Sequence, residues 1–287
     1  MFRRALCSFG RAGRSQLRPR APCVGFSGRG YLNVPRASLV SIVGPERGFC
    51  TFTPEMGRAV TAEQAVGVAE TILMYLECGI PGEELDKIRA AEDELISTRV
   101  RKMLSIFVST QLHVIVPFGF EGTQQAIEEY GVAQHQTLQG MKPDDPLIEE
   151  LKKVMIETWT VMLHRAFGIE SLPQMTLDQV RQAAAMLGSR FQDPEFLEKV
   201  GQKYSSELRS LVESKDMDKA HDELQMMIVP LYLSVIEEMK LDGMAADELG
   251  FVQLQTVINQ NMSDQIIAQN IQAGFMSIAA KAPLQQG

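Results

Sequence analysis

The chain has 287 residues, of which 45% are hydrophobic and 22% charged, and it carries a net charge of −8 at pH 7. This composition is ordinary for a globular protein. Its four cysteines form neither a disulfide framework nor a Cys-x-x-Cys motif, so a disulfide-stapled domain and a Cys-x-x-Cys zinc or redox site are not expected.

The first 49 residues differ sharply in charge from the rest of the chain. They hold nine arginines, no lysine and one acidic residue, Glu46, for a net charge of +8. Because the whole chain carries −8, residues 50–287 carry −16. Nucleic acids need clustered basic side chains for their phosphates, so the acidic part of the chain is not expected to bind RNA or DNA directly.

Basic and apolar side chains separate within the first 18 residues. At about 100° per residue, five arginines fall on one side of a helix and the apolar residues Phe2, Leu6 and Phe9 on the other. The five are Arg3, Arg4, Arg11, Arg14 and Arg18. Gly10 and Gly13 weaken this helix in water, so the segment is expected to be disordered in solution. The pattern is typical of a mitochondrial presequence; a basic arm that binds nucleic acid or anionic lipid, and a plastid transit peptide, are the alternatives.

Two copies of Arg-Gly-aromatic follow this segment. They are Arg29-Gly30-Tyr31 and Arg47-Gly48-Phe49. An arginine shortly before an aromatic residue resembles the site cut by the mitochondrial processing peptidase. The resemblance implies cleavage after Phe49, or alternatively after Tyr31, and the acid-poor composition up to about Met56 favours Phe49. We therefore predict a transit peptide over residues 1–49, with Arg29 and Arg47 joining the five earlier arginines as targeting residues.

Beyond residue 61, capping signals and apolar spacing predict successive amphipathic helices. Thr61 and Gln64 form a capping-box pair, and Asp145-Pro146 and Asp193-Pro194 are helix starts in which a cap precedes proline. The predicted helices span residues 61–78, 83–116, 124–139, 147–167, 176–191, 195–214, 216–241 with a kink at Pro230, 245–261 and 264–281. No convincing strand pattern accompanies them. The expected fold is all-α, a single domain of about nine helices over residues 50–287.

The longest uncharged run covers residues 103–120. It contains Gln111 and His113 and is broken by Pro117 and Gly119. Eighteen residues is the lower limit for a membrane span, so we interpret this run as a helix end buried in the core. Peripheral association with a membrane stays open.

Known catalytic and metal-binding motifs are absent from the sequence. Di-iron bundles pair Glu with His three positions later, and only Asp218-x-x-His221 comes near, which we interpret as a solvated helix face. The acidic stretch at residues 144–150 suits a helix N-terminus, where carboxylates accept from free N–H groups. Phosphate-loop, dinucleotide, serine-hydrolase and zinc-protease motifs do not occur. We therefore predict no catalytic, cofactor or metal site, and an enzyme is less favoured than a non-enzyme.

The C-terminal helical pair, residues 245–281, is rich in Gln and Asn and poor in charge. From residue 250 onward only Asp264 and Lys281 are charged. On the final helix an apolar stripe lies nearly opposite an amide face; the stripe is Ile267, Ile271, Phe275 and Ile278, and the face is Gln265, Gln269 and Gln272. Burying a charge costs far more than burying an amide, so these seven residues suit a surface covered by another protein. The alternative is that both helices lie at the centre of this domain.

Together these patterns predict an accessory subunit of a mitochondrial protein complex, in the matrix or on the matrix face of the inner membrane. Its expected partners are other protein subunits, with an inner-membrane energy-transducing assembly as the expected complex. One alternative is a soluble matrix assembly factor or chaperone, for which some of the 16 methionines would supply an adaptable surface. A helical enzyme with a hydrophobic ligand pocket is the less favoured alternative.

Overall fold

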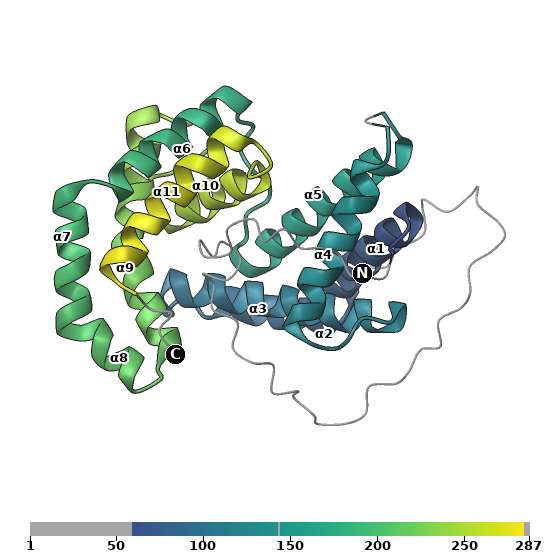
Figure 1. Ribbon diagram of the computed structural model, residues 1–287, viewed down its shortest axis with the longest axis horizontal. Helices are drawn as coiled ribbons and strands as arrows, with labels where there is room; N and C mark the ends of the chain where they lie inside the picture. The colour runs from purple at the N-terminus through teal and green to yellow at the C-terminus, as the bar shows by residue number, and fades with distance from the viewer. Residues whose placement is uncertain (1–58, 143, 284–287) are drawn as a thin grey trace, which may run out of the picture. The chain divides into compact units, whose positions relative to one another are not determined.

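The computed structural model describes residues 59–142 and 144–283 (Figure 1). Within these ranges the chain forms helices joined by turns and contains no strand, which confirms the all-α class. Their apolar side chains form one hydrophobic core. The predicted transit peptide, its targeting arginines and both cleavage sites lie outside the described residues.

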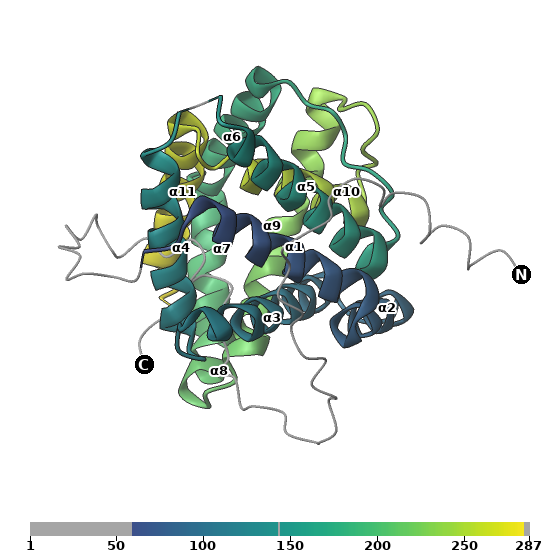
Figure 2. The same ribbon diagram turned by 90° about the vertical axis from the view of Figure 1, so that its right-hand side faces the viewer.

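The first half of the described chain packs around α1. Its elements are α1 (Ala62–Cys78), α2 (Ile80–Ala90), α3 (Ile96–Ile115), a 3-10 turn (Val116–Phe118), α4 (Gln124–Gln139) and α5 (Pro146–Phe167). α1 lies along α5 and also contacts α2, α3 and α4 (Figure 2). The predicted capping box is present, since the Thr61 hydroxyl accepts from the Gln64 N–H and the Gln64 side chain accepts from the Thr61 N–H. Asp145 likewise caps α5 by accepting from the Leu147 N–H at 2.9 Å.

The single long helix expected over residues 83–116 is wrong. The chain forms two helices there, α2 and α3, separated by a turn over residues 91–95. An unbroken helix of that length would extend about 50 Å and carry its two ends away from one another. The turn instead lets Leu85 and Ile88 of α2 and Ile96 and Val100 of α3 enter the same core.

The second half of the described chain is built on α6 and α9. Its elements are α6 (Leu177–Phe191), α7 (Pro194–Lys203), a π-helical turn (Tyr204–Leu208), α8 (Arg209–Glu213), α9 (Met217–Met239), α10 (Glu248–Gln260) and α11 (Gln265–Lys281). The π turn joins α7 to α8, so both lie within the predicted helix 195–214. α9 continues through Pro230. α11 lies along α6, where Figure 1 draws it in yellow, and α10 packs on α9.

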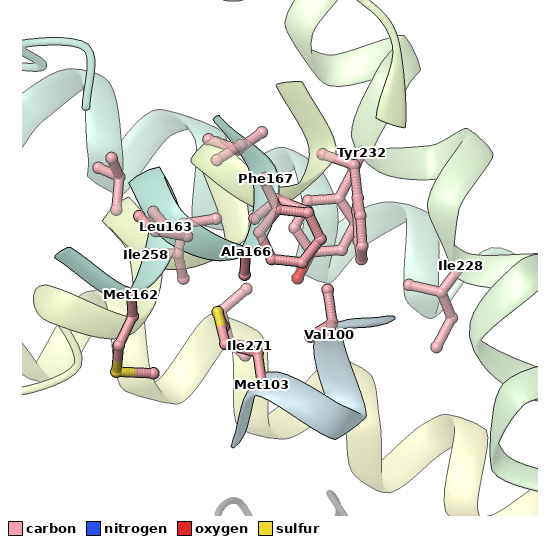
Figure 3. Close-up of a cluster of buried hydrophobic side chains, with 14 of the residues drawn as sticks. Val100, Met103, Met162, Leu163, Ala166, Phe167, Ile228, Tyr232, Ile258 and Ile271 are labelled. Atoms are coloured by element: carbon pink, nitrogen blue, oxygen red, sulfur yellow. The ribbon is translucent and has the colours of Figure 1, made fainter. Parts of the chain in front are cut away.

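Side chains from both halves meet in one cluster (Figure 3). Val100 and Met103 of α3 lie beside Phe167 of α5, Tyr232 of α9 and Ile271 of α11 in this view. The uncharged run at residues 103–120 ends in the core as expected, because Leu112, Val114 and Ile115 are buried. None of the helices in the described ranges has both the length and the apolar character to cross a membrane.

Most side chains of α10 lie in the interior of the domain, and this burial accounts for the small number of charged residues in the helix. The buried members of α10 are Gly250, Phe251, Val252, Leu254, Thr256, Val257 and Ile258. They occupy more than one face of the helix, so a charged side chain at most of these positions would be desolvated. The alternative in which the C-terminal helices lie at the centre of the domain therefore holds for α10.

Candidate functional site

Asp264, the N-cap residue just before α11, fixes this helix to α6. The Asp264 carboxylate accepts from the N–H groups of Ile266 and Ile267, at 3.0 and 3.2 Å, and so caps the helix. The same carboxylate lies 2.7 Å from Nη2 of Arg181 on α6. Hydrogen bonding from the Arg181 guanidinium is the main reason that the pKa of Asp264 is lowered. The carboxylate at the start of α11 is thus used in holding the two helices together.

The predicted apolar stripe of α11 faces the domain's own core. Ile267, Ile271 and Ile278 are buried, and Phe275 is half-buried. The ring of Phe275 lies 5.2 Å from that of Phe191 on α6, centre to centre. These four residues of the predicted partner-binding set therefore stabilise the fold and are covered within the chain.

Glycine allows the backbones of α6 and α11 to approach closely. A Cβ atom at Gly188 of α6 would stand 2.7 Å from the carbonyl oxygen of Asn270 on α11. On the opposite helix, a Cβ at Gly274 would stand 2.6 Å from a ring carbon of Phe191. Since real Cβ contacts are not that short, both positions require glycine in this packing.

The amide residues of the predicted set point outward. Gln265, Gln269 and Gln272 are exposed, and Ile266 and Met276 beside them are 49% and 50% exposed. From residue 265 to residue 280 the sequence contains no charged residue. The outward side of α11 is therefore uncharged along nearly its whole length, with two apolar side chains among its amides.

The surface continues onto α6, where one charged side chain, Asp193, borders it. A shallow groove of about 470 Å³ lies between the helices and is lined by Ala185, Ser189, Gln192, Asp193, Pro194 and Asn270. The Asp193 carboxylate is engaged as the cap of α7, accepting from the Phe196 N–H at 3.0 Å. Gln182, one turn before Ala185, is also exposed.

We call this two-helix surface the amide face. It consists of Gln182, Ala185, Ser189 and Gln192 on α6 and Gln265, Ile266, Gln269, Asn270, Gln272, Ala273 and Met276 on α11. The α6 residues, and Ile266 and Met276, were not predicted as site residues from the sequence. The 3-4-3 spacing of residues 182, 185, 189 and 192 is the sequence signal that marks the α6 side.

The side chains of the amide face can make hydrogen bonds and apolar contacts with a partner, and they form no recognisable catalytic group. Each Gln and Asn side chain presents both a donor and an acceptor, and the apolar side chains add contact area. Within the described part of the chain, no group of three or more His, Cys, Asp or Glu side chains is placed to hold a metal ion.

The Asp218 and His221 pair is not a solvated helix face, because His221 is buried. Its Nδ1 atom lies 2.6 Å from the Met217 carbonyl oxygen. Asp218 instead pairs with Arg101 of α3 at 3.2 Å. This pair therefore belongs to the contact between α3 and α9.

Comparison with protein families, curated proteins and solved structures finds no match to this chain.

Proposed function

We propose that this protein is a structural or accessory subunit of a larger mitochondrial assembly and that it docks through the amide face. The observation that carries the proposal is a contrast in charge. Residues 50–287 have a net charge of −16, yet amide, hydroxyl and small or apolar side chains line the groove where α6 and α11 meet, with Asp193, the cap of α7, as the one charged residue among those that line it. A surface that stays in water has no physical reason to avoid charge.

Docking on this surface requires little desolvation of charged groups. Charged groups are depleted from the centres of protein interfaces because their desolvation is costly. An amide that is covered by a partner can exchange its water hydrogen bonds for bonds to that partner. Ile266 and Met276, towards the two ends of the amide face on α11, would supply apolar contact. The occupant that fits is an uncharged helix or loop of another protein subunit.

Mitochondrial residence rests on the arginine-rich leader and is proposed separately from docking. Within the organelle, we propose an inner-membrane energy-transducing assembly as the complex, contacted from the matrix side. Replacing Arg3, Arg4, Arg11, Arg14 and Arg18 by Glu should keep a fluorescent fusion of the full chain in the cytosol. Import of that variant would contradict the assignment of residues 1–49 as a transit peptide. It would not affect the proposal that the protein docks through the amide face.

Native-gel fractionation of mitochondria tests the docking proposal. The wild-type protein should comigrate with a large complex, and the double variant Gln269→Lys/Met276→Lys should migrate near monomer size. Both side chains are exposed, so the fold should survive, which circular dichroism checks. The double variant Val132→Lys/Gln136→Lys, at two exposed positions of α4, adds the same two charges away from the amide face and should still comigrate.

Three results would contradict the docking proposal. Wild-type protein near monomer size would favour a soluble assembly factor or chaperone over a subunit. A double variant that still comigrates would show that the amide face is not the docking surface. Larger wild-type species that contain only this chain would point to self-association.

A further inference from the structure

α4 is attached to the domain by few large side chains. Only three of its sixteen residues are buried, and they are Ala126, Tyr130 and Ala133. α1, a helix of nearly equal length, buries six residues: Ala62, Ala65, Val66, Val68, Ile72 and Leu76. Stabilisation by burial scales with the apolar area removed from water, and an alanine side chain removes little. Tyr130 is therefore the one large side chain that α4 buries.

The space beneath α4 is incompletely filled. A cavity of about 80 Å³ lies between Tyr130 and Gln134 of α4 and Leu151 and Met155 of α5, and side chains of α1 and α3 complete its wall. Voids of this size are few in protein interiors, because the atoms that line a void lose their dispersion contacts on that side. α4 is therefore held less tightly on the side that faces α5.

The Tyr130 hydroxyl favours the release of α4 from the core. Tyr130 is 2% exposed, and its hydroxyl has no hydrogen-bond partner among the described residues. A buried polar group without a partner lowers the stability of the state in which it is buried. When α4 moves away from the core, water can bond to this hydroxyl. The apolar contact that is lost on opening is thus partly offset.

The two ends of α4 suit a hinged movement. Gly119, before the helix, has a φ of 89°, and a Cβ at Gly122 would meet nothing closer than the Val116 side chain, at 3.8 Å. Residues 121–123 are exposed, and glycines in such a turn can absorb the backbone rotation that a hinge requires. Near the other end, the Thr137 hydroxyl donates to the Val60 carbonyl oxygen just before α1, at 2.5 Å.

We propose that α4 is a hinged lid, which opens about the turn at residues 119–123 while the rest of the domain stays folded. Opening separates α4 from α1 and α3, which it contacts in the closed state. It uncovers an uncharged wall that three helices form with Val68, Ile72, Phe107, Leu151 and Trp159. The lid is independent of the amide face, whose residues all lie on α6 and α11.

Native-state hydrogen exchange of the full-length protein, at low urea concentrations and resolved by peptide mass spectrometry, tests the lid. Backbone amides of α4 should show protection factors about 100-fold lower than those of α6. This difference is expected because an isolated helix of sixteen residues is marginal in water once it has left the core. Exchange in α4 should also depend little on urea, since opening exposes far less surface than global unfolding.

Three variants separate lid opening from global unfolding. Thr137→Val removes the hydrogen bond to Val60 and should lower the protection of α4 about fivefold. Tyr130→Phe removes the unpartnered hydroxyl and should raise the protection of α4 about tenfold. Ile258→Val, at a position of α10 that is 1% exposed, is the matched control. It should lower the protection of α6 about fivefold and leave that of α4 unchanged, because α10 stays folded when the lid opens.

Four results would overturn the lid. Amides of α4 as protected as those of α6, or protection of α4 that falls with Ile258→Val, would mean that α4 exchanges only through global unfolding. Exchange of α1 and α5 together with α4 would mean that the whole first half opens. Amides of α4 without any protection would mean that no closed state forms. Equal protection of α4 in Tyr130→Phe and the wild type would overturn the role assigned to the hydroxyl.

Discussion

Arg165 of α5 and Asp86 of α2 form a two-point ion pair. Nε of the guanidinium donates to one carboxylate oxygen at 2.9 Å, and Nη2 donates to the other. Nη1 of the same group donates to the carbonyl oxygens of Leu76 and Glu77, at 2.9 and 2.6 Å, in the last turn of α1. Gly82 of α2 lies against it, where a Cβ would stand 2.1 Å from Nη1. One side chain therefore holds the ends of three helices together.

Arg165→Met should destabilise the protein by about 2–3 kcal/mol, because it removes several charge-assisted hydrogen bonds at once. Arg165→Lys keeps the charge without the planar fork and should cost about 1–2 kcal/mol. Urea denaturation measures both. Arg209→Met removes an exposed pair with Glu213 within one helix, and should change stability by less than about 0.5 kcal/mol. Equal effects of Arg165→Met and Arg209→Met would show that the three-helix contact contributes little.

Stability should fall at acid pH partly through Asp86 and Asp264. Hydrogen bonds from Arg165 and Arg181 lower the pKa of these two carboxyls below the ordinary value of 3.8. A carboxyl whose pKa is lower in the folded state stabilises the fold above its unfolded pKa. That contribution is lost as the pH falls through about 4 towards the folded pKa. Asp86→Asn and Asp264→Asn should lower stability at pH 6 and flatten its decline between pH 5 and pH 3.

Unfolding midpoints at pH 6, 5, 4 and 3 measure this decline. Asp242→Asn, in the exposed turn after α9, is the comparison and should leave the slope close to that of the wild type. A slope that stays as steep in both Asp86→Asn and Asp264→Asn would contradict the assignment of acid sensitivity to these two pairs.

Local chemistry explains which helices could be predicted from the sequence. Thr61, Asp145, Thr176 and Asp193 each accept from an N–H in the first turn of a helix, and such caps depend on residues two or three positions apart. The break at residues 91–95 depends instead on where the apolar side chains of α2 and α3 pack into the core. No side-chain cap or proline marks this break, so apolar periodicity alone predicted one continuous helix in place of two.

The candidate site could be predicted only in part for the same reason. Helical spacing correctly separated Gln269 from Ile271 onto opposite sides of α11. It could not show which side the chain itself covers, and it gave no reason to group Ser189 of α6 with Asn270. That neighbourhood arises from the close approach at Gly188, which is a contact between residues 82 positions apart.

Gly188→Ala should destabilise the protein by about 1–3 kcal/mol, because the new methyl group overlaps the backbone of Asn270. Gly201 of α7 is the matched control, since a Cβ there meets no atom within 4 Å. Gly201→Ala should raise stability by about 0.5–1 kcal/mol through helix propensity alone. Opposite signs in urea denaturation are the expected result. A neutral or stabilising Gly188→Ala would show that α6 and α11 can separate without cost.

Asp222 of α9 is a buried carboxylate that α3 neutralises. It accepts from the Thr98 hydroxyl at 2.8 Å and from Nη2 of Arg101 at 2.9 Å, and its side chain is 10% exposed. Arg101→Met leaves this carboxylate in the interior without its cation and should cost about 3 kcal/mol. The double variant Arg101→Met/Asp222→Leu removes both charges. Its cost should be smaller than the sum of the two single variants by about 1–3 kcal/mol.

A double-mutant cycle in urea measures this coupling. Lys102 and Glu94 provide the comparison pair, since they lie nearby at 46% and 31% side-chain exposure. Water screens such a pair, so the cycle of Lys102→Met and Glu94→Gln should give less than about 1 kcal/mol. A coupling between Arg101 and Asp222 no larger than this would mean that water reaches the buried carboxylate, and that apolar packing alone holds α3 against α9.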